Sequence, residues 1–342
     1  MTSLVRGRPA TVKDVARHAG VSASTVSNVL HGRSSVADEI RARVEAAIAD
    51  VGYVPSAAGR LLRSGTSEVI QLALPDIRSP YYSALAHTVI QRARDLGMTV
   101  VIEETDGAVE QEQRVASSHP HRGVGGTLIC PMSLTSDDLA ELRPELPTVL
   151  LGEHTQGDAF DQVFIDSRAA ARDVAAHLVG RGRRRFAFVG TERGEGTGPG
   201  ALRLAGVRDV LRAEGLDLPD AAVLGTPDFG RETGISVGEG LPVGEDGFDA
   251  VVCATDELAV GVLHALARRG VDVPRDVAVT GWDDAPESRF VTPSLTTVAH
   301  DLDDLAAAAL GFVTARRADP ARRPGRHVSP HRLVVRDSTR AV

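Results

Sequence analysis

Apolar positions in the first 52 residues repeat with helical spacing. Between residues 12 and 19 they fall at i, i+3, i+4 and i+7, directly after Thr11, a favourable N-cap. A second helix is predicted over residues 23–30, after a cap at Ser22, and a third from about residue 36 to residue 51. Two short helices joined by a turn of about three residues are typical of a helix-turn-helix.

From residue 68 onward the pattern changes to continuous apolar runs that alternate with amphipathic helices. The runs predict strands, at residues 69–76, 98–105, 126–131, 147–153, 163–167, 185–190, 249–257 and 276–284. The helices between them include residues 82–96, 169–181, 202–214 and 258–270. Such strands belong to parallel sheets covered on both faces, and about ten units exceed one sheet. We therefore expect an α/β protein with an all-α head and two doubly wound parallel-sheet lobes, and a ligand between the lobes.

The outer face of the predicted second helix carries short side chains, mostly hydrogen-bonding ones: Ala23, Ser24, Thr25 and Asn28. Such side chains let a helix approach base edges in the major groove, and asparagine favours adenine. Lys13, Arg17 and Arg33 flank this face and suit phosphate contacts. A small three-helix bundle that mediates protein contacts is the alternative.

Charge and composition narrow the class of protein. Residues 1–65 hold nine Lys and Arg against five Asp and Glu, whereas the remainder holds 29 against 41. A basic head on an acidic body suits a nucleic-acid-binding module. No run approaches the ~18–20 apolar residues of a membrane span, and no signal peptide opens the chain, so we expect a cytoplasmic protein. Cys130 and Cys253 lie in apolar runs and are interpreted as buried, with no metal or redox role.

One stretch makes a family resemblance specific. The segment ATVKDVARHAGVSASTVSNVLHGRSSVADEIRARVEAAIADVGYVPSAAGRLL resembles the DNA-binding head of the lactose/galactose-repressor family of transcription regulators. The resemblance implies that residues 53–66 form a hinge helix, which folds in the minor groove and wedges Leu62 into the central base step. An isolated helix of about eight residues is marginal, and Gly59, where relatives have alanine, weakens it further. A passive flexible linker is the alternative.

By the same resemblance, the DNA-contacting residues lie in the head and the hinge: Thr11, Val12, Lys13, Ser22, Ala23, Ser24, Thr25, Asn28, His31, Ser35, Tyr53, Ser56, Ala57, Arg60 and Leu62. Relatives often have arginine at the position of Asn28, so this chain departs from the family on the recognition helix.

The body resembles the same family, and through it the periplasmic sugar-binding proteins, most clearly in ATDELAVGVLHALARRGVDVPRDVAVTGWDDAPESRFVTPSLTTVAHD. The resemblance implies three parts: a helix-turn-helix head (1–52), a hinge (53–66) and a ligand-binding and dimerisation domain (67–342). It also implies that the two lobes share the chain, the first with about 67–162 plus 296–323 and the second with about 163–295 plus 324–338.

The resemblance also implies candidate effector-binding residues, several of them just past predicted strand ends: Tyr81, Tyr82, Arg203, Phe229, Asp256, Trp282 and Asp283. Aromatic faces can cover the C–H side of a sugar, while carboxylate and guanidinium groups bind its hydroxyls. Alternatives stay open: the tyrosine pair as packing, Arg203 and Asp256 as inter-strand or cap residues, and Asp284 as a helix cap.

We therefore expect a transcription repressor. It binds palindromic operator DNA as a homodimer or a tetramer, and a small effector, with a sugar as the expected class, controls it. No cofactor, metal or membrane partner is expected. An activator or dual regulator on the same scaffold is the alternative. An enzyme is disfavoured because GEGTGPG does not fit GxGxxG and no Walker A, HExxH or GxSxG motif is present. A transport-type binding protein is disfavoured by the DNA-binding head. The sequence does not identify the effector.

Overall fold

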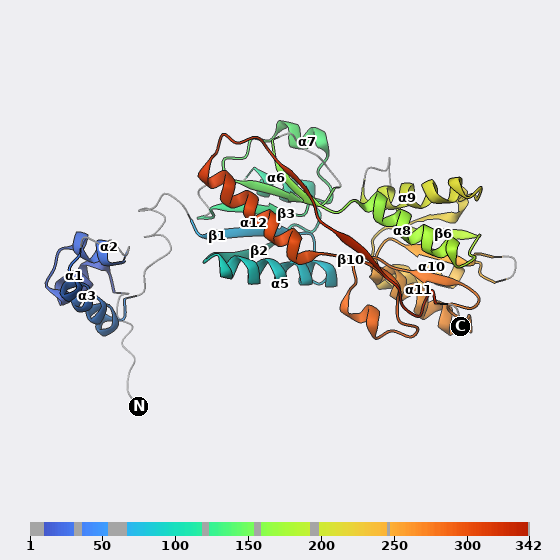
Figure 1. The fold of residues 1–342 in the computed structure, drawn as a ribbon, viewed down its shortest axis with the longest axis horizontal. Helices are drawn as coiled ribbons and strands as arrows, with labels where there is room; N and C mark the ends of the chain where they lie inside the picture. The colour runs from blue at the N-terminus through green and yellow to red at the C-terminus, as the bar shows by residue number, and fades with distance from the viewer. Residues whose placement is uncertain are drawn as a thin grey trace, which may run out of the picture. The chain divides into compact units, whose positions relative to one another are not determined.

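The computed structural model (Figure 1) describes residues 10–30, 36–53, 67–117, 123–153, 159–191, 198–244 and 247–340. The chain divides into two compact units, residues 1–67 and 68–342. The first unit is the helical head and the second is the α/β body. None of the helices in the described ranges is long and apolar enough to cross a membrane.

Within residues 10–30 and 36–53 the head has three helices, α1 (Val12–Ala19), α2 (Ala23–Leu30) and α3 (Asp38–Val51). Its core contains Val15, Val26 and Val44, which are completely buried. The expected caps are present: the Asp14 carboxylate accepts hydrogen bonds from the Thr11 N–H (2.9 Å) and hydroxyl (2.6 Å), and Ser22 Oγ accepts one from Thr25 N (3.0 Å). The predicted helix-turn-helix is confirmed, with α3 beginning two residues later than expected.

The first lobe of the body is built on a six-stranded parallel sheet, ordered β11-β5-β4-β3-β1-β2. Its strands are β1 (Val69–Leu74), β2 (Thr99–Glu104), β3 (Gly126–Ile129), β4 (Thr148–Leu151), β5 (Asp161–Phe164) and β11 (Arg326–Val328). Figure 1 shows α5 (Pro80–Asp95) and α12 (Leu302–Ala318) on one face of the sheet and α6 (Val109–Ala116) and α7 (Ser136–Glu141) on the other. Alternate strand residues face the two helical layers, which explains the continuous apolar runs.

The second lobe has a four-stranded parallel sheet, ordered β7-β6-β8-β9. Its strands are β6 (Phe186–Thr191), β7 (Val223–Gly225), β8 (Ala250–Cys253) and β9 (Ala278–Thr280). Two helix pairs accompany it, α8 (Ser167–Gly180) with α9 (Pro199–Ala213) and α10 (Arg231–Gly240) with α11 (Asp256–Arg268). Short 3-10 turns occupy Asp220–Ala222 and Pro286–Arg289. The expected architecture, two parallel-sheet lobes behind a helical head, is confirmed.

The chain passes between the lobes three times: after β5, after β10 (Thr297–His300), and between β11 and β12 (His331–Val334). β10 and β12 pair antiparallel as a ribbon. The expected lobe boundaries shift here. β5 pairs with β4, and β11 adds beside β5, so residues 163–164 and 326–328, expected in the second lobe, lie in the first. Hydrogen bonding to the first sheet's edge, which no local pattern reveals, holds both segments there.

Four helices of the body begin two or three residues earlier than the apolar pattern predicts. In α8 and α11 the reason is a cap: Asp166 accepts from Ala169 N (2.8 Å) and Thr255 from Leu258 N (3.2 Å). In α5 and α9 a proline, Pro80 or Pro199, occupies the first turn, where its missing N–H costs nothing. These first turns come after strands of the parallel sheets, so they lie toward the edge where a ligand is expected.

Glycines allow α10 and α11 to pack backbone against backbone. A Cβ at Gly234 would overlap the carbonyl oxygen of Leu258, and a Cβ at Gly261 would overlap that of Arg231. Gly240, near the end of α10, faces open space instead. The two helices can therefore approach this closely because Gly234 and Gly261 have no side chain.

We predict that Gly234→Ala lowers the free energy of unfolding by about 1–3 kcal/mol, because the added methyl group must push α10 away from α11. Gly240→Ala is the matched control, and should leave stability unchanged or raise it by up to about 1 kcal/mol. Thermal unfolding of both variants checks this. Equal midpoints would show that the helix pair is not tightly packed.

Candidate functional site

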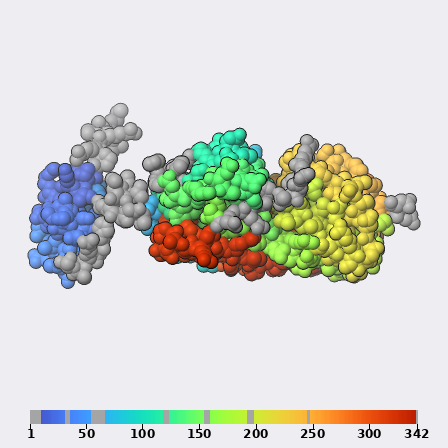
Figure 2. Space-filling model, turned by 90° about the horizontal axis from the view of Figure 1, so that it is seen from above, coloured from blue at the N-terminus to red at the C-terminus, as the bar shows by residue number. Residues whose placement is uncertain are grey.

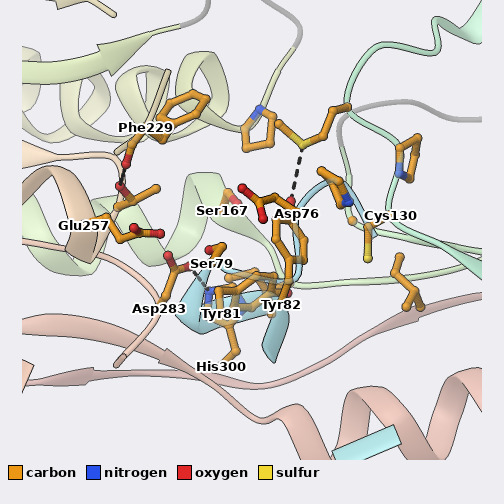
Figure 3. A pocket seen from close by; sticks show the side chains of 18 of the residues that line it. Asp76, Ser79, Tyr81, Tyr82, Cys130, Ser167, Phe229, Glu257, Asp283 and His300 are labelled. Carbon is orange, nitrogen blue, oxygen red and sulfur yellow. Dashed lines mark hydrogen bonds and ion pairs between the residues drawn. The ribbon is translucent and has the colours of Figure 1, made fainter. Parts of the chain in front are cut away.

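A cavity of about 540 Å³ lies between the two lobes and is lined by residues of both. This volume is within the usual range for small-molecule sites, ~300–1,000 Å³. Figure 3 shows Tyr81, Tyr82 and Cys130 from the first lobe and Phe229 and Asp283 from the second, arranged around one space. The sequence prediction of a site between two lobes therefore has a matching cavity in the structure.

Aromatic rings form much of the cavity wall. Tyr81 and Tyr82 open α5, and their ring centroids lie 5.1 Å apart at 67°. The Tyr82 hydroxyl donates to Met132 Sδ at 3.4 Å. Burial raises the pKa of both tyrosines, so their hydroxyls stay protonated. Phe229 lines the cavity from the second lobe. Three predicted effector residues thus lie in the cavity wall.

Asp283 and His300 form the polar centre of the cavity. Asp283 Oδ1 lies 3.6 Å from His300 Nε2, beyond hydrogen-bond distance. Burial raises the pKa of Asp283 well above its usual value, although the nearby Arg203 opposes this shift. Burial lowers the pKa of His300 to about 3, so its imidazole is neutral near pH 7. Asp283 also has a φ of 112°, a conformation that is costly for a non-glycine residue.

Arg203 lines the cavity, and its guanidinium group packs on the ring of Trp282. The Arg203 guanidinium lies 4.3 Å from the Trp282 ring centroid and donates to the Ala254 carbonyl. Trp282 is 1% exposed and does not line the cavity. The structure therefore keeps Arg203 as a candidate effector residue and corrects Trp282 to a buried support.

Asp256 is also corrected. It is 1% exposed, does not line the cavity, and accepts hydrogen bonds from Ala285 N (2.7 Å), Ser288 Oγ (2.6 Å) and Thr297 Oγ1 (2.6 Å). Burial raises its pKa to about 6, and these hydrogen bonds oppose the rise. Its carboxylate joins α11 to the segments around Ser288 and Thr297, which is the structural alternative considered above.

Asp284, expected as a helix cap, is instead an ion-pair residue. Its carboxylate pairs with Arg336 and lies 3.7 Å from Arg289 and 3.9 Å from Arg332. The short helix that follows has Ala285, not Asp284, in the cap position. Asp284 therefore holds the C-terminal segment of the chain.

Several cavity residues escaped the sequence analysis. Glu257 hydrogen-bonds Ser79 of the other lobe, and its Oε2 lies 3.2 Å from Arg231 Nη1. Glu153 follows β4, and burial raises its pKa. His300 ends β10. These three side chains lie at or just past strand ends, and that position was the available signal. Asp76, Arg78, Arg231 and Glu232 also line the cavity and were not among the predicted effector residues.

A buried carboxylate fixes the loop that carries Met132 into the cavity. Glu112 is fully buried and accepts hydrogen bonds from the N–H groups of Met132 (2.7 Å), Ser133 (3.0 Å) and Leu134 (2.9 Å). The loop after β3 is thus held by three charge-assisted hydrogen bonds. Cys130 and Cys253 are buried as expected. Within the described ranges no group of three His, Cys, Asp or Glu could hold a metal ion.

In the head, the predicted DNA-reading residues divide into exposed and core positions. Ala23, Ser24 and Lys13 are exposed, and Thr25 and Asn28 are half-buried on the same helix-turn-helix. The Ser22 hydroxyl, expected to contact DNA, joins those of Ser24 (2.7 Å) and Thr25 (2.8 Å). The exposed start of α2 therefore presents a compact group of hydroxyls.

Tyr53 and Val12 have structural contacts as well. Tyr53 is 8% exposed in the core of the head, and Val12 packs against that core. The burial of Tyr53 argues against its side chain as a major DNA contact. The remaining predicted DNA residues lie outside the described residues: His31, Arg33, Ser35, Ser56, Ala57, Arg60 and Leu62.

Comparison with known proteins gives a consistent match at both ends of the chain. Residues 11–56 match the description "Bacterial regulatory proteins, lacI family", and residues 175–339 match "Periplasmic binding protein-like domain". The ribose operon repressor of Escherichia coli is 32% identical over 319 residues, which cover 91% of this chain and 94% of that protein.

Two solved structures are similar over nearly the whole chain. The Lac repressor dimer bound to operator and the anti-inducer ONPF is 25% identical, with a TM-score of 0.83, covering 98% of this chain and 100% of that one. The transcriptional regulator CelR in complex with cellobiose is 26% identical, with a TM-score of 0.67, covering 97% and 100%.

Replacing the carboxylate of Asp283 or of Asp256 by an amide should change the free energy of unfolding in opposite directions. Asp283→Asn removes a buried charge that no hydrogen bond among the described residues compensates, so we predict a gain in the free energy of unfolding of about 1 kcal/mol at pH 8. Because the folded-state pKa of Asp283 is raised, the wild type loses stability as pH rises above about 4, its unfolded pKa. The gain should therefore be larger at pH 8 than at pH 5.

Asp256→Asn is the matched comparison, because the amide keeps one acceptor oxygen but places an NH₂ group where the other carboxylate oxygen accepts from a donor. It should lower the free energy of unfolding by about 1–3 kcal/mol. Denaturant unfolding at both pH values measures the two effects. A loss of stability in Asp283→Asn at pH 8 would make that residue structural as well.

Proposed function

Because this chain belongs to the LacI family of bacterial regulatory proteins, we propose that it is a repressor: a cytoplasmic homodimer that binds a palindromic operator and senses a sugar between its lobes. The chain is a DNA-binding regulator with an effector-binding domain and not an enzyme. The observation that carries the proposal is one polypeptide with a helix-turn-helix head and an aromatic-lined cavity between two parallel-sheet lobes.

The repressor assignment draws on the similar proteins. The E. coli relative is named a repressor of the ribose operon, and the Lac repressor structure is a dimer bound to operator. In this chain, Ser24 and Asn28 on α2 would reach base edges, while Lys13 and Arg17 would contact phosphates. Arg60 and Leu62 of the hinge would enter the minor groove, as in the family.

The sugar class draws on the cavity and on the CelR–cellobiose complex. Tyr81, Tyr82 and Phe229 offer faces for a sugar's C–H surface, and Asp283 and Arg203 offer groups for its hydroxyls. Effector binding would shift the population toward a closed cleft and change the spacing of the two hinges in the dimer. We propose that this change releases the operator.

Two substitutions in the head should have different signatures. Asn28→Ala should weaken binding to a selected operator by about 1–3 kcal/mol and leave binding to scrambled DNA nearly unchanged, because a base contact is lost. Arg17→Ala should weaken binding to the operator and to scrambled DNA alike, because its side chain, 80% exposed, would contact a phosphate. It should also reduce the slope of log affinity against log salt concentration by about 1. Anisotropy titrations from 50 to 200 mM salt compare them. Equal losses on both DNAs for Asn28→Ala would remove α2 from base recognition.

The hinge can be tested in the same assay. Leu62→Ala should weaken operator binding by about 1–3 kcal/mol, since an inserted apolar side chain loses its burial. Gly59→Ala should tighten operator binding, because alanine favours a helix by roughly 1 kcal/mol. If residues 53–66 are a passive linker, neither substitution should change operator affinity.

A further inference from the structure

The chain concentrates positive charge where α12 ends and β11 begins. Residues 316–326, which we call the arginine segment, contain five arginines and one acidic residue, Asp319. Residues 66–342 as a whole hold 29 Lys and Arg against 41 Asp and Glu. In Figure 2 the red end of the chain, to which this segment belongs, forms part of the surface of the first lobe. A local excess of positive charge on an acidic body indicates a binding surface for an anionic partner.

A buried carboxylate holds the arginine segment in place. Asp161, completely buried at the start of β5, accepts hydrogen bonds from Arg316 Nε (2.7 Å) and Gly325 N (2.7 Å). It also accepts one from Arg322 Nη1 at 3.3 Å. Gly325 lies against the ring of Phe312, which a Cβ would overlap. The backbone of the segment is therefore fixed against the sheet and against α12.

The arginines of the segment outnumber the carboxylates beside them. Arg317 Nη1 lies 3.4 Å from Glu68 Oε2, and its Nε donates to the Gly125 carbonyl at 3.0 Å. Five guanidinium groups are thus accompanied by three carboxylates, those of Asp161, Asp319 and Glu68. Because Asp161 serves two guanidinium groups, acceptors are scarce: Arg316 Nη2 is buried and has no hydrogen-bond partner among the described residues. The segment can therefore accommodate further negative charge.

Arg323 and Arg326 are the exposed arginines of the segment. No hydrogen bond or ion pair joins the Arg323 side chain to the residues that the structure describes. The Arg326 guanidinium lies 5.0 Å from the Phe164 ring centroid, a contact that limits its freedom and leaves its charge in place. Pro324, between the two in sequence, restricts the backbone. Exposed guanidinium groups on a fixed segment suit bidentate hydrogen bonds to phosphate oxygens.

The position of the arginine segment favours DNA as the source of the phosphate. Glu68, which lies beside Arg317, is the first residue of the body, so the segment lies where the chain from the DNA-binding head enters. Figure 1 shows the end of α12 and the start of β1 at the same end of the first lobe. The chain between Tyr53 and Glu68 can span at most about 50 Å, the length of about 15 base pairs. This tether keeps the segment close to any DNA that the head binds.

We propose that Arg323 and Arg326 contact phosphates of the DNA duplex to which the head is bound, so that the body adds sequence-independent affinity to the operator complex. This inference rests on the proposed function and extends DNA binding from the head to the body. Each phosphate contact releases counterions, so it steepens the fall of affinity with salt concentration.

The test uses the full-length protein in anisotropy titrations with a selected operator, from about 50 to 200 mM salt. The double variant Arg323→Gln/Arg326→Gln should bind about 10-fold more weakly near 100 mM salt. The slope of log affinity against log salt concentration should fall by about 2–4, because a dimer loses up to four arginine contacts.

The matched control is the double variant Arg181→Gln/Arg212→Gln. It removes two exposed arginines from the second lobe and so changes the net charge equally. Its operator affinity should stay within about 2-fold of wild type, with an unchanged slope, because distant exposed charges are screened. An equal loss in the two double variants would assign the effect to net charge and overturn the proposal. A loss in Arg323→Gln/Arg326→Gln without a change of slope, or no loss at all, overturns it as well.

Chemical modification of arginine by phenylglyoxal gives a readout on the wild-type protein. Operator DNA should protect Arg323 and Arg326 and leave Arg212 as reactive as in the free protein, as measured by mass spectrometry of peptides. Equal modification of Arg323 with and without operator contradicts the proposed contact. Failure of the proposed function would appear differently, as equal wild-type affinity for operator and scrambled DNA, whereas failure of this inference leaves that preference intact.

Discussion

The structure depends on keeping polar groups buried and incompletely bonded between two lobes. Both His300 ring nitrogens and Arg203 Nε are buried without a hydrogen-bond partner among the described residues, and Asp283 lies beside them in a cavity where an unpaired polar atom is costly. Each such group costs roughly 1–3 kcal/mol, a substantial part of the net stability of a domain. The lobes tolerate this cost because each has its own sheet and its own closed hydrophobic core.

The surrounding structure holds these groups in place. Asp256 and Glu112 are buried carboxylates with three hydrogen bonds each, and they fix the segments next to the cavity. Trp282 carries the Arg203 guanidinium on its face. The same residue type thus has two roles. Asp256, with three hydrogen-bond donors around it, holds the structure together, whereas Asp283, which lacks such donors among the described residues, is available to a ligand. The number of internal partners, rather than burial, distinguishes the two.

The sequence predicted helices and strands better than it predicted which strands pair and which side chains bond to one another. The helices at 12–19 and 23–30 and the strand–helix alternation follow from local periodicity, and both were found. The placement of β11 beside β5 was missed, because it depends on pairing residues more than 160 positions apart. Asp256 was assigned to the effector because its bonds to Ser288 and Thr297 connect residues 32 and 41 positions away. His300 was missed because a lone histidine carries no pattern until its unpaired nitrogens are seen in a cavity.

The central claim is that one equilibrium couples the cavity to the DNA-binding head. Coupling of this kind is reciprocal: if an effector weakens operator affinity by some factor, the operator must weaken effector affinity by the same factor. Calorimetric titration of the effector into the free protein and into the operator complex measures that factor directly. We predict weaker effector binding by the operator complex, with a ratio equal to the loss of operator affinity at saturating effector. Equal effector affinity in both states would contradict the account.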